Sequence, residues 1–95
     1  MTNFPNQFMN FLDHLNSRCE FNNSTFRFTF KSGKKYTKII DTKGSVHCFI
    51  DNITGDIYKP ASYSAPAKGI RYNLEKDYDL LINNADIYGS YLYCR

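Results

Sequence analysis

Apolar residues recur at spacings of three and four from Phe4 to about Cys19, which is typical of one face of an α-helix. Asn3 can cap this helix, and Pro5 fits its first turn. The polar cluster of residues 22–24 should end it. We therefore expect an N-terminal helix whose buried stripe is formed by Phe4, Phe8, Phe11, Leu12, Leu15 and Cys19.

The hydrophobic period changes to two at Thr25, where three phenylalanines alternate with polar residues as far as Lys31. Such alternation indicates a strand with one buried face. Polar, glycine-containing turns separate three further predicted strands, which are Tyr36 to Asp41, Val46 to Asp51 and Asp56 to Lys59. The last of these turns, Asn52 to Gly55, has the Asx-rich start and late glycine of a type I turn with a bulge.

Strand geometry also predicts which side chains share a face, because successive residues of a strand point to opposite sides. In the strand from Val46 to Asp51, one face should carry Val46, Cys48 and Ile50. The other face should carry His47 and Phe49.

The chain after Pro60 is irregular before it becomes helical again. Residues 60–69 contain two prolines, one glycine and three alanines, and we interpret them as an ordered loop because Tyr63 interrupts the small residues. Asn73 is a candidate cap for a second helix through about Ala85. After Gly89, the alternation around Tyr91 and Tyr93 predicts either a short final strand or a tail laid on the core.

These elements predict an α+β fold: an N-terminal helix packed on an antiparallel meander of about four strands, plus a short C-terminal helix. With 95 residues, the chain should form one domain, residues 1–95. Its hydrophobic fraction is 42%, and aromatic residues make up 17% of the chain. Because large rings bury much surface each, this composition allows one core and leaves some tyrosines for the surface.

The charge is mildly basic overall and unevenly distributed. The net charge is +3, and five lysines lie between Lys31 and Lys43, opposed only by Asp41. The C-terminal part is acidic instead, with Glu75, Asp77, Asp79 and Asp86. One end of the molecule should therefore be positive and the other negative.

The three cysteines, Cys19, Cys48 and Cys94, form no Cys-x-x-Cys pair and have no cluster of histidines nearby. This pattern indicates reduced thiols rather than a disulfide framework or a zinc site. The N-terminus lacks the pattern of a signal peptide, and no apolar stretch is long enough to span a membrane. We expect a soluble protein of the cytoplasm that is not secreted and has no membrane partner.

Catalytic patterns are scarce. His47 and Cys48 are neighbours, so they should lie on opposite faces of a strand, which argues against a Cys–His dyad. Asp51 and Asp56 flank a tight turn, and hydrogen bonding within the turn explains them better than acid–base or calcium chemistry. We therefore expect no enzyme activity, no metal and no cofactor.

Two basic segments are candidates for binding. The lysine-rich hairpin from Lys31 to Lys43, with Lys34, Lys35 and Lys38 as its candidate contacts, could bind phosphates, since each lysine that neutralises one adds salt-dependent affinity. Lysines on an exposed hairpin also prevent edge-to-edge pairing of sheets, which is the alternative interpretation.

The second segment alternates tyrosines with cations on the two-proline loop and its flanks, at Tyr58, Lys59, Tyr63, Lys68, Arg71 and Tyr72. Nucleobases stack on such rings. The alternative is that Tyr63 packs the loop onto the sheet and Tyr72 covers the second helix.

The block from Ser45 to Leu74 and the later GSYLY resemble a family of small uncharacterised proteins encoded by marine cyanophages, related ocean phages and some large algal viruses. The resemblance covers about residues 25–93. It rests on an SVH strand start, the D-x-x-TGD-x-YKPA turn and strand, APAK, and R-x-N-L before a helix. Tyr63 stands where the family usually has tryptophan, which favours a packing or stacking aromatic over a reacting group.

This resemblance implies a viral origin and a helix with an antiparallel sheet, and it supplies no catalytic residues. We therefore expect a non-enzymatic binding or assembly module in an infected cell, with weak nucleic-acid contact through the basic-aromatic loop. The alternative is a protein–protein interaction module that forms a homo-oligomer or binds a host or viral partner.

Overall fold

The first helix, α1, runs from Pro5 to Phe21 in the computed structural model, which describes residues 2–93. Its buried face matches the predicted stripe, apart from the half-buried Phe4. The predicted cap is wrong, because Phe4 occupies the cap position and no side chain caps the helix. Asn3 instead donates its main-chain N–H to the carbonyl of Asn52 at 2.7 Å, which ties the start of the chain to the sheet.

Five strands form one antiparallel sheet in the order β1-β2-β3-β4-β5. They are β1 (Phe28–Ser32), β2 (Tyr36–Asp41), β3 (Val46–Asp51), β4 (Asp56–Tyr58) and β5 (Tyr72–Asn73). The helix α2 (Tyr78–Asn84) and the 3-10 helix η1 (Ser90–Leu92) follow. The α+β prediction is confirmed. The meander has one strand more than expected, because residues after the two-proline loop return to pair with β4.

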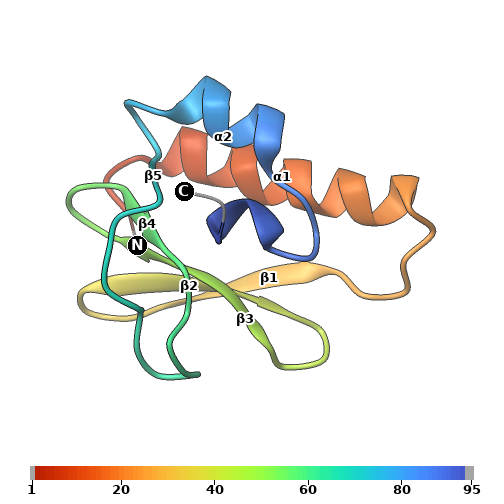
Figure 1. The fold of residues 1–95 in the computed structure, drawn as a ribbon, viewed down its shortest axis with the longest axis horizontal. Coiled ribbons are helices and arrows are strands. Elements are labelled where there is room, and N and C mark those ends of the chain that lie inside the picture. The colour runs from red at the N-terminus through yellow and green to blue at the C-terminus, as the bar shows by residue number, and fades with distance from the viewer. Residues whose placement is uncertain (1, 94–95) are drawn as a thin grey trace.

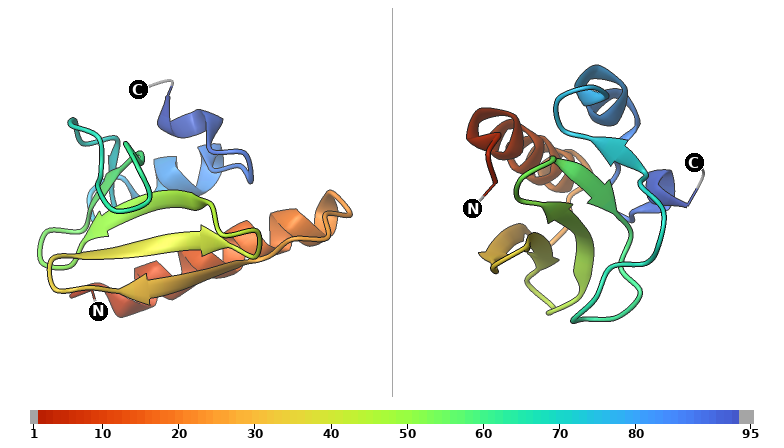
Figure 2. Two further views of the ribbon diagram at one scale, coloured as in Figure 1. Left: turned by 90° about the horizontal axis from the view of Figure 1, so that it is seen from below. Right: turned by 90° about the vertical axis from the view of Figure 1, so that its left-hand side faces the viewer.

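Both α-helices lie on one side of the sheet, and the loop of residues 60–69 extends on the other side (Figure 1). Figure 2 shows α1 running along the back of the strands. We call the side that carries the helices the helix face and the other side the outer face. The core lies on the helix face, between α1, α2, η1 and the sheet, and includes Phe8, Phe11, Leu15, Ile39, Ile50, Ile57, Leu74, Leu81 and Leu92.

The turn between β3 and β4 follows the predicted chemistry. The Asp51 carboxylate accepts hydrogen bonds from the N–H groups of Ile53 and Thr54 at 2.9 and 3.0 Å. Gly55 has φ of +78°, and a Cβ at this position would lie 3.0 Å from the ring of Phe4. Only glycine meets both requirements without strain, so this turn also fixes how closely the start of the chain approaches.

The C-terminal part departs from the prediction at its start. Asn73 caps no helix: its side-chain oxygen accepts from the N–H groups of Glu75 and Lys76 in a turn, and α2 begins only at Tyr78. Residues 90–92 form η1, with Tyr91 and Leu92 buried, so the alternative of a tail on the core is confirmed. Cys94 lies outside the described residues. Within residues 2–93, no helix is long and apolar enough to cross a membrane.

Candidate functional site

A row of large side chains crosses the outer face. Lys38 on β2 pairs with Phe49 on β3, which pairs with Tyr58 on β4. Directly paired residues of neighbouring strands share a face, so these three lie side by side. The ring of Tyr36 meets those of Phe49 and Tyr58 edge to face, with centroids 5.9 and 6.0 Å apart. Phe49 is only 3% exposed, although it does not belong to the core cluster. The outer face thus has its own small layer of packed rings.

The two-proline loop, residues 60–69, is fixed by main-chain hydrogen bonds. Pro60 and Pro66 form an antiparallel bridge. The N–H of Ala67 donates to the carbonyl of Lys59 at 2.8 Å, and the N–H of Ala61 donates to the carbonyl of Ala65 at 3.0 Å. The loop is therefore a small hairpin of defined shape, as the sequence predicted for an ordered loop.

Lys38 joins this loop to the sheet. Its ammonium nitrogen donates to the main-chain carbonyl of Tyr63 at 3.0 Å and lies 3.7 Å from the centroid of the Tyr63 ring. Tyr63 nevertheless remains 49% exposed. The ring thus has a cation on one side and leaves about half of its surface to solvent.

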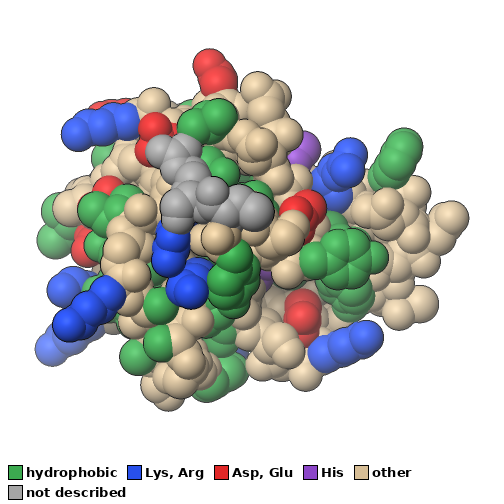
Figure 3. All heavy atoms as spheres, viewed as in Figure 1, with side chains coloured by type: hydrophobic (Ala, Val, Ile, Leu, Met, Phe, Trp, Pro, Cys, Tyr) green, Lys and Arg blue, Asp and Glu red, His purple; other side chains and the backbone are tan. Residues whose placement is uncertain are grey.

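Beside this contact, the outer face is hollowed. The first depression, which we call the lysine hollow, has a volume of about 250 Å³. Its lining consists of Lys31, Ser32, Gly33, Lys34, Lys35, Tyr36, Lys38, Phe49 and Ser64. Four of these residues are lysines, and none of them is acidic. Lys and Arg side chains gather at the end of the molecule where the β1–β2 turn lies, at the lower left of Figure 3.

Asp51 on β3 pairs with Tyr36, which is one of the residues that line the lysine hollow. Burial acts to raise its pKa, but the hydrogen bonds from Thr54 and Ile53 outweigh burial and lower it, with a further contribution from Lys35. Asp51 is therefore ionised, and the β3–β4 turn already uses one of its oxygens. Asp51 does not line the hollow, and the four lysines that do line it keep it cationic.

The predicted site residues do not all come together. Tyr58, Tyr63, Lys34, Lys35 and Lys38 lie on or beside the outer face, as described above. Lys59 is half-buried, with its ammonium group 4.6 Å from the centroid of the Tyr93 ring.

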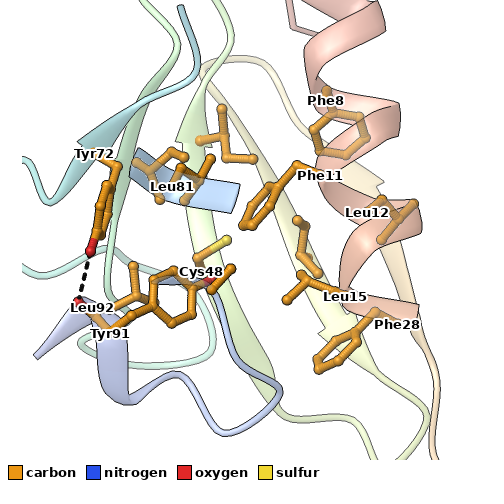
Figure 4. Packing of buried hydrophobic residues seen from close by; sticks show 14 of the residues in the cluster. Phe8, Phe11, Leu12, Leu15, Phe28, Cys48, Tyr72, Leu81, Tyr91 and Leu92 are labelled. Atoms are coloured by element: carbon orange, nitrogen blue, oxygen red, sulfur yellow. Dashed lines mark hydrogen bonds between the residues drawn. The ribbon is translucent and has the colours of Figure 1, made fainter. Parts of the chain in front are cut away.

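The other predicted cations and Tyr72 follow the two-proline loop. Lys68 is exposed, whereas Arg71 is half-buried and its N–H donates to the carbonyl of Ile57. Tyr72 is only 3% exposed, and its hydroxyl donates to the carbonyl of Tyr91 at 3.5 Å (Figure 4). The prediction of Tyr72 as a surface contact is wrong, because β5 turns its ring into the core.

Two residues of the site escaped the sequence analysis as binding candidates, namely Tyr36 and Phe49. Both are aromatic residues at strand positions opposite to the core stripe, and this was the signal that could have found them. Lys31 lines the hollow as well. It belongs to the hairpin from Lys31 to Lys43, for which the sequence predicts contact with phosphates.

A bulge changes the environment of His47. The pairing of β2 with β3 shifts at this point: Ile39 opposes Cys48, but Ile40 opposes Val46. The extra residue, His47, turns to the helix face, where its ring lies 4.9 Å from that of Phe28. The prediction that His47 and Cys48 lie on opposite faces is therefore wrong.

His47 and Cys48 are both sealed in the core. His47 Nε2 lies 2.7 Å from the hydroxyl of Tyr91. Burial lowers the pKa of His47 to about 4, against the opposing influence of the Asp86 and Asp41 carboxylates. Burial also raises the pKa of the Cys48 thiol well above its usual range. Because a reactive thiol needs access and a low pKa, this pair stabilises the fold and does not form a nucleophilic centre.

Within residues 2–93, no three His, Cys, Asp or Glu side chains lie close enough together to hold a metal ion. Asp56 accepts hydrogen bonds from Thr54 and Asn73, so its carboxylate, like that of Asp51, connects turns of the chain.

Neither the comparison with curated proteins nor the comparison with solved structures finds a match. The model of one protein family matches residues 2–94, which is nearly the whole chain. The protein therefore belongs to the family described as a family of unknown function (DUF7717).

Proposed function

We propose that the outer face binds nucleic acid through its phosphate backbone, without catalysing a reaction. The observation that carries the proposal is the lysine hollow, in which four lysines converge on a depression with no acidic lining residue among those described. A phosphodiester chain is the common cellular polyanion whose repeating charges match such a cluster.

The shape of the site supports this proposal over a purely protective role for the lysines. Lysines that only prevent sheet pairing need to line an exposed strand edge. Lys38 instead lies on β2, between β1 and β3, and its ammonium group reaches over the outer face to Tyr63. The hollow therefore combines Lys31 of the edge strand β1 and the turn residues Lys34 and Lys35 with Lys38 from the interior of the sheet. Ser64 of the two-proline loop completes its lining, so the lysines surround a recess rather than a bare edge.

The proposal predicts a defined dependence on salt. Each phosphate that a lysine neutralises on a single strand contributes about −0.7 to the slope of log K against log salt concentration, so four lysines give about −3. Fluorescence anisotropy of a labelled oligonucleotide, titrated between about 50 and 200 mM salt, measures this slope. An affinity that does not change with salt, or no binding at low salt, would contradict the proposal.

A charge-matched pair of variants assigns the binding to the hollow. Lys34→Glu/Lys35→Glu reverses two exposed charges of the lysine hollow, whereas Arg18→Glu/Lys76→Glu makes the same change in net charge at exposed positions outside its lining. We expect the first double variant to abolish measurable binding and the second to weaken it only slightly. Equal losses would mean that net charge alone attracts the nucleic acid.

The block from Ser45 to Leu74 supports two further parts of this proposal. Its resemblance to proteins of marine phages and large algal viruses points to a viral origin, and hence to work in the cytoplasm of an infected cell. In that setting, the protein would act as a binding or assembly module on nucleic acid. A protein partner or self-association is the competing outcome, which sizing at several protein concentrations with and without nucleic acid detects.

A further inference from the structure

A second depression lies on the other side of the two-proline loop. It has a volume of about 300 Å³ and is lined by Gly44, Ser45, Val46, Pro60, Ala61, Ser62 and Tyr63. None of these residues carries a charge, in contrast to the lysine hollow. We call this depression the tyrosine hollow.

The two hollows are adjacent. The lysine hollow includes Lys38 and Ser64, and the tyrosine hollow includes Tyr63, the residue that Lys38 contacts through both its carbonyl and its ring. The two-proline loop therefore contributes to both depressions, with the cationic one on one side of it and the uncharged one on the other. A ligand that spans the loop would contact the lysines of one hollow and the ring of Tyr63 in the other.

We propose that the tyrosine hollow is a subsite for an unpaired nucleobase, so that the protein selects single strands over duplexes; this inference rests on the proposed function. A nucleotide has the same two parts as the site, an anionic phosphate and a flat base. The base stacks on the exposed part of the Tyr63 ring, while its phosphate lies among the lysines. Stacking on an aromatic side chain requires a base whose face is free, which a duplex does not offer.

The lining of the tyrosine hollow fits a base in other respects. Pro60, Ala61 and Val46 offer apolar surface to the face of the base. The hydroxyl groups of Ser45 and Ser62 are available to its polar edge, in a depression at the small end of the range for ligand sites. Because this hydrogen bonding is sparse, the subsite tolerates any base.

Lys38 has a double role in this arrangement. Its ammonium group covers one side of the Tyr63 ring and fixes the loop through the Tyr63 carbonyl. The ring is thus held in place before the ligand arrives, which reduces the entropy lost on binding.

Four competitors in an anisotropy assay test the inference. Three have the same length, namely a single-stranded oligonucleotide, the same strand with abasic sites, and its duplex. The fourth, inorganic polyphosphate, carries repeated negative charge without bases. We expect the single strand to bind about 5-fold to 140-fold more tightly than the abasic strand, which corresponds to stacking of one base. The duplex offers no free base face and should bind through phosphates alone, so Tyr63→Ala should leave its affinity unchanged.

Variants then assign the difference to the tyrosine hollow. Tyr63→Ala and the hollow-filling Ala61→Leu should bring the single strand down to the affinity of the abasic strand, while Tyr63→Phe keeps the ring and the preference. Tyr88→Ala, at a tyrosine that is 79% exposed and belongs to neither hollow, is the matched control and should change nothing. All these positions are exposed, and circular dichroism verifies the fold of each variant.

The outcomes separate the two proposals. If all probes bind equally and Lys34→Glu/Lys35→Glu weakens all of them, the phosphate site stands and the base subsite is overturned. If the single-strand preference survives both Tyr63→Ala and Ala61→Leu, the base stacks elsewhere on the protein, and the inference is again overturned. If no probe binds, the proposed function itself fails.

Discussion

The two faces of the sheet carry the same kinds of aromatic residue, but they are shielded from solvent to different degrees. On the helix face, α1, α2 and η1 cover the strands, and even the polar atoms of His47 and Tyr91 pair with each other inside. On the outer face, a ten-residue loop is the cover, and a hollow remains on each side of it. Aromatic composition therefore does not distinguish the two faces. The difference lies in what covers the rings, because helices close the helix face and a short loop leaves the outer face accessible to a ligand.

The largest effect should come from the helix face. Phe11 is fully buried in the core between α1 and the sheet. Phe11→Ala removes most of its ring and leaves a cavity, so we expect the free energy of unfolding to fall by about 3–5 kcal/mol. Urea denaturation followed by circular dichroism measures this change.

Phe21→Ala, on the same helix, is the matched control for Phe11→Ala. The side chain of Phe21 is 77% exposed, so its truncation should cost less than about 0.5 kcal/mol. A cost below about 1 kcal/mol for Phe11→Ala would show that the helix face is loosely packed, and the contrast between the two faces would not hold.

Periodicity alone was sufficient to predict most of the helix face. The stripe of α1 repeats over many residues and is buried as that pattern requires. In β1 the alternation places Phe28 in the core and leaves Thr29 and Lys31 exposed. Features of one or two residues, such as a β-bulge or a very short strand, could not be predicted from periodicity. The bulge at His47 leaves no trace in the alternation, and β5 has only two residues, which is too short for a period to appear.

The outer face was predictable in its composition but not in its geometry. The sequence marked Lys38 and Tyr63 as candidates, yet it placed them in two separate segments. Their contact depends on how far the two-proline loop bends over β2, which is set by main-chain hydrogen bonds such as that from Ala67 to Lys59. The sequence also marked Tyr72 as a candidate contact, with cover of the second helix as the alternative. Pairing of β5 with β4 turns its ring into the core, and a strand of two residues gives no pattern that predicts this.

The second prediction concerns the polar contact inside the helix face. His47 has a pKa of about 4 in the folded protein, below the ordinary histidine value of 6.5, because burial disfavours the charged ring. Below pH 6.5 the unfolded chain therefore takes up a proton that the folded protein does not, and stability is lost as the pH falls towards 4. Between pH 7 and pH 5, we expect the free energy of unfolding to fall by about 2 kcal/mol. Urea titrations at the two pH values measure the difference.

His47→Gln, which keeps a polar group within reach of Tyr91, should remove most of this pH dependence. The control is His14→Gln. Burial and the charge of Arg18 lower the pKa of His14 too, but this residue is only half-buried, so its variant should keep most of the dependence. The range from pH 7 to 5 lies above the usual pKa values of carboxyl groups. A loss of pH dependence in His14→Gln and not in His47→Gln would contradict the assignment.

The smallest effect should come from the outer face. In a double-mutant cycle with Lys38→Met and Tyr63→Leu, we expect a coupling of about 0.5–1 kcal/mol in the free energy of unfolding without nucleic acid. The hydrogen bond of Lys38 goes to the main-chain carbonyl of Tyr63 and is present with either side chain at 63, so the cycle reports the ring contact. The pair of Lys59 with Tyr93, at 4.6 Å against 3.7 Å, should couple less.

A coupling above about 2 kcal/mol would change the comparison between the two faces, because that value is typical of desolvated contacts. Lys38 and Tyr63 would then belong to a second closed core, and their loss would weaken nucleic-acid binding only by loosening the fold. A small coupling together with a large loss of single-strand affinity in Tyr63→Ala has the opposite meaning. The ring would then contribute little to stability and much to binding, as expected of a side chain that the fold holds half in solvent for a ligand.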